Sequence, residues 1–105
     1  MTEALITCSI ENALARITID NPPLNPLTTE LRDELLAGFD ALYSRKDAIR
    51  AVVLTGKGEA FMAGADIKSF PELTQEKAKA RLKESRQLYL SIEQFERPVI
   101  CAING

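Results

Sequence analysis

The chain has 105 residues and a mass of 11.6 kDa, which allows one small domain. Its 13 basic and 15 acidic residues give a net charge of −2, so charge offers no reason to bind nucleic acid or an anionic membrane, and we expect neither as a partner. It contains no histidine, which excludes Ser-His and Cys-His catalysis and imidazole metal ligands, and we expect no metal site.

The two cysteines, Cys8 and Cys101, are too few for a disulfide scaffold or a four-thiolate zinc site. Each lies in a strand-like or apolar segment, so we predict two buried, reduced thiols. No apolar run approaches the ~20 residues of a membrane span. Residues 1–7 lack the basic start and apolar stretch of a signal peptide. We therefore expect a cytoplasmic protein.

The first elements follow from residue spacing. Residues 6–20 are predicted to form a β-hairpin that turns at 11–12, because apolar and polar residues alternate along its second strand. Three prolines within residues 21–26 favour a rigid, extended loop. A helix is expected to follow, capped by Thr28 or Thr29. Its apolar face is formed by Leu31, Leu35, Phe39 and Leu42.

Strands and helices alternate in the second half of the chain. Residues 51–55 and 99–103 are apolar runs rich in β-branched side chains, which predicts strands covered on both faces. Between them a helix is expected from about Thr74 to about Arg97, where Pro98 stops it. This order predicts parallel pairing through right-handed crossovers, and hence an α/β fold. The side chains expected to be buried on this helix are Ala78, Leu82, Leu88, Tyr89, Ile92 and Phe95.

Two features suggest a phosphate ligand but favour simpler interpretations. The glycines of residues 56–58 follow a strand, yet Phe61 occupies the third glycine position of a dinucleotide fingerprint and no Gly-Lys-Ser/Thr is present. We interpret them as a flexible surface turn. Five cations between residues 77 and 86 would suit a polyanion, but a solvated helix face partly paired with Glu76 and Glu84 is favoured.

Residues 63–68 are the most informative segment. Small side chains leave its backbone open to a ligand, and Gly64 can adopt angles that alanine cannot. If Asp66 caps a short helix that runs to Phe70, the free N–H groups at its start can bind an oxyanion. Small residues before a helix are also common packing features, and Asp66 suits capping as well as catalysis.

Four segments, taken together and in order, resemble the enoyl-CoA hydratase/isomerase (crotonase) family. The most specific of them contains the pattern Phe-x-Ala-Gly-Ala-Asp at residues 61–66. The resemblance implies an α/β fold of the crotonase-like (ClpP/crotonase) type, a spiral of ββα units. Residues 1–105 would be its N-terminal portion, truncated after Gly105. The four segments are residues 21–27, 51–56, 60–67 and 97–105.

The resemblance also implies a site. Carried over by position, the backbone N–H of Ala65 would be one of two donors that hold the thioester oxygen of an acyl-CoA and stabilise an enolate-like anion. Coenzyme A would enter as part of the substrate, with no covalently bound cofactor and no metal. The resemblance further implies that the parent protein assembles as a homotrimer or hexamer. The residues implied to bind the substrate or its CoA are Pro23, Leu24, Ala63, Gly64, Asp66, Ile67 and Lys68.

The chain departs from the family in two ways. Pro26 stands where the family usually has alanine or serine, and it stiffens that loop. The family continues after Asn-Gly with a glycine triplet that supplies the second oxyanion donor, followed by two glutamates that handle water and proton. None of these lies within residues 1–105. We therefore expect a parent lyase or isomerase of fatty acid metabolism, and no catalysis by these residues alone.

Two other functions stay open. The first is a short, non-catalytic protein of the same family that binds CoA or assembles with longer relatives. The second is an unrelated small α/β interaction domain, against which the four ordered matches argue.

Overall fold

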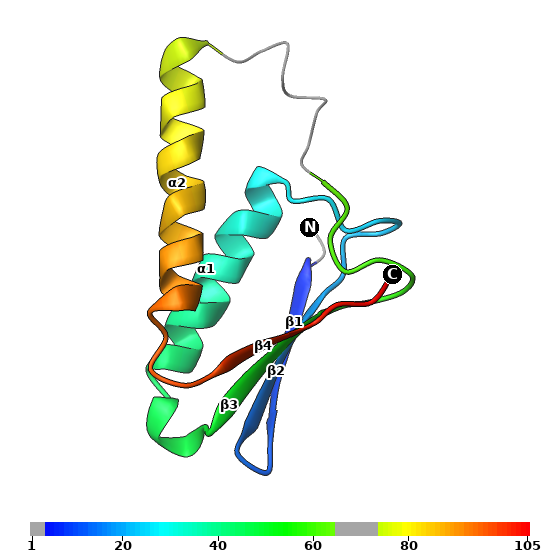
Figure 1. Cartoon of the computed structure of the whole chain (residues 1–105), viewed down its shortest axis with the longest axis vertical. Helices are drawn as coiled ribbons and strands as arrows, with labels where there is room; N and C mark the ends of the chain where they lie inside the picture. The colour runs from blue at the N-terminus through cyan, green and yellow to red at the C-terminus, as the bar shows by residue number, and fades with distance from the viewer. Residues whose placement is uncertain (1–3, 65–73) are drawn as a thin grey trace.

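The computed structural model describes residues 4–64 and 74–105, which form a four-stranded sheet with two helices on one side (Figure 1). Helix α1 spans Thr29–Tyr43 and helix α2 spans Gln75–Glu93. A short 3₁₀ turn, Lys46–Ala48, follows α1. No helix in the described part of the chain is long and apolar enough to cross a bilayer.

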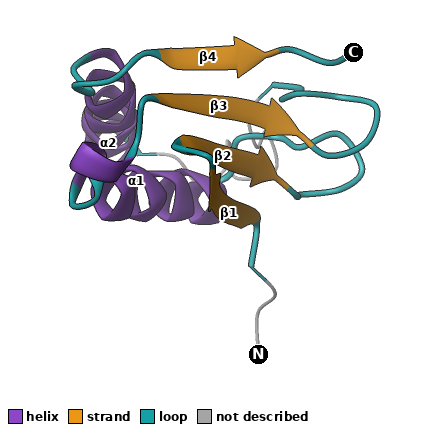
Figure 2. Ribbon diagram, turned by 90° about the horizontal axis from the view of Figure 1, so that it is seen from below, coloured by secondary structure: helices purple, strands orange, loops and turns teal. Residues whose placement is uncertain are grey.

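The sheet is mixed, with the strand order β1-β2-β3-β4, and Figure 2 shows the strands side by side in this order. Strand β1 (Ile6–Glu11) pairs antiparallel with β2 (Leu14–Ile19). Strand β3 (Ala51–Gly56) lies parallel to β2, and β4 (Val99–Ala102) lies parallel to β3. The α/β fold and the parallel pairing are confirmed. Both crossovers advance in the same direction across the sheet, which places both helices on the same face.

Local sequence signals account for the hairpin and for the start of α1. Asn12 and Ala13 both have positive φ, 53° and 65°, as the tight two-residue turns of hairpins require. Thr28 caps α1, since its hydroxyl accepts the N–H of Leu31 at 3.1 Å. The predicted hairpin and Thr28 cap are therefore confirmed, but the turn lies at Asn12 and Ala13 rather than at residues 11–12.

One hydrophobic core fills the space between α1 and the sheet. Alternate residues of β2 and β3 face the helix, and the predicted apolar face of α1 packs against them. Phe39 also meets Phe95 edge-on, with ring centroids 5.8 Å apart. Among the described residues, those that are apolar and buried are Ala15, Ile17, Ile19, Leu31, Leu35, Phe39, Leu42, Ile49, Val52, Leu54 and Leu88.

The structure corrects the burial predicted for β4 and for the cysteines. Strand β4 is an edge strand, so Ile100 is 54% exposed and Cys101 is exposed rather than buried. Cys8 lies on β1 at the opposite edge and is likewise exposed. Each edge strand has a neighbour on one side only, which a run of apolar letters does not reveal. The prediction of two buried thiols was wrong.

Helix α2 is less buried than predicted and shorter. It ends at Glu93 rather than near Arg97, and Leu88 is its one buried residue among those described. Its first half projects past the sheet (Figure 1), which leaves Leu82 72% exposed. In its second half Tyr89 is 56% exposed. Glu84 forms an ion pair with Arg32 of α1 at 2.7 Å, a partner outside the basic cluster.

Candidate functional site

Three segments that are far apart in the sequence meet at the carboxyl end of β2 and β3. The first is residues 20–28, which follow β2, and the second is residues 56–64, which begin at the last residue of β3. Residues 103–105 come from the end of β4, and Figure 1 shows the C-terminus beside the loop that follows β3. Parallel strands end at the same edge of a sheet, and this is where α/β proteins bind their ligands.

A short backbone ladder joins the first two segments. The N–H of Ala63 donates to the carbonyl of Leu24 at 2.9 Å, and the N–H of Leu27 donates to the carbonyl of Gly64 at 3.0 Å. Leu24, 52% exposed, therefore lies beside Ala63 and Gly64, which are also exposed, and Pro23 precedes Leu24 in the same loop. Four of the residues predicted for the site are thus brought together.

The buried side-chain amide of Asn25 connects the first two segments by hydrogen bonds. Asn25 is 1% exposed and has a φ of 54°, a left-handed conformation that asparagine tolerates better than most residues. Its Oδ1 accepts the N–H of Asn21 at 2.8 Å. Its Nδ2 donates to the carbonyls of Lys57 and Ala60 at 3.2 and 2.7 Å. All three bonds go to backbone, so this side chain fixes the path of both loops.

Asn104 holds the other side of the loop that follows β3. Its Nδ2 donates to the carbonyls of Gly56 and Gly58, both at 2.9 Å. Its Oδ1 lies 3.3 Å from the N–H of Gly56 and 3.4 Å from the Thr55 hydroxyl, both of which donate to it. The sequence indicated only a turn at 104–105. Neither Asn25 nor Asn104 was predicted as a site residue.

The glycines of this loop serve two different purposes. A Cβ on Gly56 would lie 2.7 Å from both the Cα and the carbonyl oxygen of Phe61. The backbone of Phe61 therefore packs directly against Gly56, and no side chain fits at position 56. Gly56 is buried, which corrects the interpretation of a flexible surface turn. Gly58 is exposed with a φ of 88° and open space around it, as a turn glycine should be.

The assembled loops can present backbone to a ligand. Gly64 has a φ of 76° and nothing within 4 Å of its hypothetical Cβ, so the chain is unobstructed there. The next four predicted site residues, Ala65, Asp66, Ile67 and Lys68, lie outside the described residues, as does the predicted short helix from Asp66 to Phe70. Their roles stay predictions.

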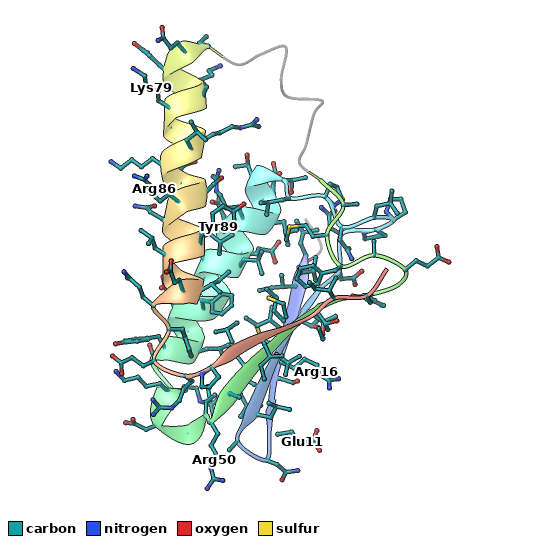
Figure 3. The ribbon with its side chains drawn as sticks, in the orientation of Figure 1. Glu11, Arg16, Arg50, Lys79, Arg86 and Tyr89 are labelled. Atoms are coloured by element: carbon teal, nitrogen blue, oxygen red, sulfur yellow. The ribbon has the colours of Figure 1, made fainter. Side chains whose placement is uncertain are left out.

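The charges of the described loops include an ion pair between Lys57 and Asp20, whose Nζ and Oδ2 are 3.6 Å apart. Within residues 4–64 and 74–105 no group of three His, Cys, Asp or Glu residues could hold a metal ion. Figure 3 shows Lys79 and Arg86 along α2, on the opposite side of the molecule from the three loops. The basic cluster of α2 is therefore remote from the described loops of this site.

Known proteins resemble this chain in sequence. The sequence model of the enoyl-CoA hydratase/isomerase family matches residues 9–105. A Bacillus subtilis protein named "probable enoyl-CoA hydratase" is 37% identical over 102 residues, which cover 95% of this chain and 39% of that protein. The peroxisomal fatty acid beta-oxidation multifunctional protein MFP2 of Arabidopsis thaliana is 33% identical over 101 residues, covering 90% of this chain and 13% of that protein.

A solved structure supports the same relationship. The enoyl-CoA hydratase/carnithine racemase of Magnetospirillum magneticum superposes with a TM-score of 0.90 at 31% identity, covering 99% of this chain and 40% of that one. The chain thus spans about two fifths of the length of the relatives it matches, apart from the longer multifunctional protein. The predicted crotonase fold is confirmed for this part, and the chain belongs to the enoyl-CoA hydratase/isomerase family.

Proposed function

We propose that this chain forms one part of the acyl-CoA site of an enoyl-CoA hydratase or isomerase. The observation that carries the proposal is the ladder between Leu24 and Ala63 and between Leu27 and Gly64. It juxtaposes the two segments that the family resemblance assigns to the substrate, although they are about forty residues apart. Residues 1–105 would then be the first portion of a larger crotonase-like domain.

The chemistry rests on a backbone donor. The N–H of Ala65, which directly follows Gly64 in the chain, would donate to the thioester oxygen as negative charge develops on it. Removal of one such donor typically slows a reaction by about 10²–10³-fold. Because the donor is a peptide group, the absence of histidine from the chain is no obstacle. The residues proposed to contact the substrate or its CoA are Pro23, Leu24, Ala63, Gly64, Asp66, Ile67 and Lys68.

Several further properties belong to the same proposal. Coenzyme A is part of the substrate, and neither a covalent cofactor nor a metal takes part. The acid and base that handle water and proton lie outside residues 1–105, so these residues alone do not catalyse hydration. We also propose assembly of the whole enzyme as a homotrimer or hexamer, and a cytoplasmic location, where the thiols of Cys8 and Cys101 stay reduced.

A titration and an assay test the proposal together. Calorimetry of the 105-residue chain should show tighter binding of crotonyl-CoA than of free CoA, because the thioester oxygen is the group recognised. An assay with crotonyl-CoA should show no hydration above buffer. Equal affinity for the two ligands would contradict the thioester site, and robust turnover would contradict the assignment of the acid and base elsewhere.

A second candidate function is assembly with a longer relative without catalysis. Large apolar side chains exposed on α2 and beyond β4 favour it, and they include Leu82, Tyr89 and Ile103. Analytical ultracentrifugation of the chain mixed with a full-length relative would show a joint species if this is its role. Independent sedimentation of the two would contradict it.

A further inference from the structure

We propose that the side-chain amides of Asn25 and Asn104 act as a pair of positioning residues, one on each side of the loop of residues 56–64. By fixing that loop they set the affinity of the site for an acyl thioester over free CoA. The loop-holding part stands on the structure alone. The part that concerns the thioester rests on the proposed function.

The first support is the number of loop carbonyls that accept hydrogen bonds from the two amides. The Nδ2 of Asn104 donates to the carbonyls of Gly56 and Gly58, and the Nδ2 of Asn25 donates to those of Lys57 and Ala60. Four of the five carbonyls in residues 56–60 therefore accept from one of two asparagine side chains. Residues 56–60 include two glycines, Gly56 and Gly58, and glycine backbone has more conformational freedom than that of other residues, so these bonds restrict the segment.

The second support is burial. Asn25 is 1% exposed, and every hydrogen-bonding position of its amide that the structure describes is directed at backbone. A buried amide that loses its partners incurs a desolvation penalty, so the loop and the side chain must keep their mutual position. Asn21 reinforces the contact, since its own Nδ2 donates to the carbonyl of Pro26 at 3.0 Å.

The third support is the segment that follows residues 56–60 in the chain. The loop held by the two amides continues to Ala63 and Gly64, whose backbone pairs with Leu24 and Leu27. A displacement at residues 56–60 is therefore transmitted along a short, paired segment to the proposed thioester site. Misplacement of reacting groups by about 1 Å can cost a reaction about 10²-fold.

Aspartate variants remove the donors. Asn25→Asp and Asn104→Asp each keep one acceptor oxygen and replace the donor by a carboxylate oxygen, which removes both bonds to loop carbonyls and repels those carbonyls. Asn12→Asp is the matched control, because Asn12 is also left-handed, with a φ of 53°, but lies in the exposed hairpin turn. The readout is amide hydrogen exchange at Ala63 and Leu27, whose N–H groups make the ladder and are not bonded to either asparagine.

We expect exchange at Ala63 and Leu27 to accelerate about tenfold in either aspartate variant and to be unchanged in Asn12→Asp. Exchange at Arg50, whose N–H donates to Ala13 at the far end of the sheet, should stay constant in all three. In the double variant the effect on exchange at Ala63 and Leu27 should be smaller than the sum of the effects of the two single variants, because both amides hold the same loop. If Asn25→Asp does not fold, Asn104→Asp, half-buried at the rim, provides the test.

Ligand affinity separates positioning from a merely structural role. Calorimetry should show that either aspartate variant lowers the preference for crotonyl-CoA over CoA about tenfold, whereas general loosening would weaken both ligands alike. Unchanged exchange at Ala63 and Leu27 with intact thioester preference would overturn the paired hold and leave the proposed function standing. Accelerated exchange with no thioester preference in the unsubstituted chain would overturn the proposed function, while the hold on the loop would stand.

Discussion

The helix-facing side of the sheet and the loop cluster at its carboxyl end are stabilised by different interactions. On the helix-facing side, Ile17, Leu35 and Phe39 are at most 1% exposed and pack by shape and apolar area alone. In the loop cluster, backbone is held by the amides of Asn25 and Asn104. Apolar packing is distributed over many contacts, whereas the position of the loop depends on a few hydrogen bonds from two side chains. The loops can therefore be loosened while the core stays folded.

The largest effect should come from the packed side. Phe39→Ala removes a buried ring that meets Phe95, and we expect the free energy of unfolding to fall by about 3–5 kcal/mol. Urea denaturation followed by circular dichroism measures it. Leu82→Ala, at a side chain 72% exposed, is the control and should change stability by less than about 0.5 kcal/mol. Comparable losses in the two variants would show that the core is not where the structure places it.

Substitution of Gly56 should affect both regions. The Cβ in Gly56→Ala would lie 2.7 Å from backbone atoms of Phe61, which cannot rotate away, so we expect a loss of about 1–3 kcal/mol. It should also reduce the preference for crotonyl-CoA over CoA. Gly58→Ala meets nothing within 4 Å and bears only the strain of its positive φ, about 1–2 kcal/mol. Equal loss of thioester preference in both variants would contradict the close approach at Gly56.

The ion pair between the helices should have a smaller effect. The Arg32 side chain is 6% exposed and lies 2.7 Å from Glu84 and 3.1 Å from Asp33. Glu84→Gln leaves Asp33 in place, so we expect a loss of only about 1 kcal/mol, measured by urea denaturation. Glu93→Gln, an exposed position on the same helix, should be neutral. A neutral Glu84→Gln would mean that Asp33 alone compensates the buried guanidinium.

The weakest effect should be the pH dependence of the surface cluster at Tyr43, Lys46 and Glu96. The hydrogen bond from Lys46 holds the pKa of Glu96 below its ordinary value, and the hydrogen bonds with Tyr43 and Glu96 raise the pKa of Lys46. A lowered carboxyl pKa contributes stability above about pH 4.3 that is lost as pH falls through the folded pKa. A raised lysine pKa contributes stability below about pH 10.4 that is lost above it.

Both groups are exposed to solvent, so the contribution is slight. Unfolding midpoints measured from pH 3 to pH 7 should decline slightly less steeply on the acid side in Glu96→Gln than in the unsubstituted chain. A steeper decline in the variant would contradict the direction of the Glu96 shift.

The same contrast explains what could be predicted from the sequence. The hairpin, the Thr28 cap and the apolar face of α1 follow from periodicity and capping, which are local properties. The exposure of Cys101 and Leu82 depends on which element lies next to them in space, and spacing carries no information about that. Asn25 and Asn104 act on residues 56–60 across more than thirty positions of sequence, so only the folded chain shows their partners.

Part of the site had a signal and part did not. The small residues Ala63 and Gly64 indicated exposed backbone, and in the structure both are exposed and lie beside Leu24. Asn25 lies between Pro23 and Pro26, which have no backbone N–H to donate to the carbonyls of a neighbouring loop. A side-chain amide in such a segment can supply the missing donors, and this signal could have identified Asn25 as a bridge between loops. For Asn104 the Asn-Gly pair indicated a turn, which concealed its role.

A titration followed residue by residue tests the central claim most directly. Nuclear magnetic resonance spectra of the ¹⁵N-labelled chain should be recorded with increasing crotonyl-CoA and, in parallel, with free CoA. We predict that amide shifts specific to the thioester concentrate at Leu24, Ala63 and Gly64, with none on α2. Identical shifts for the two ligands, or shifts centred on Lys79 and Arg86, would contradict a thioester site at the carboxyl end of the sheet.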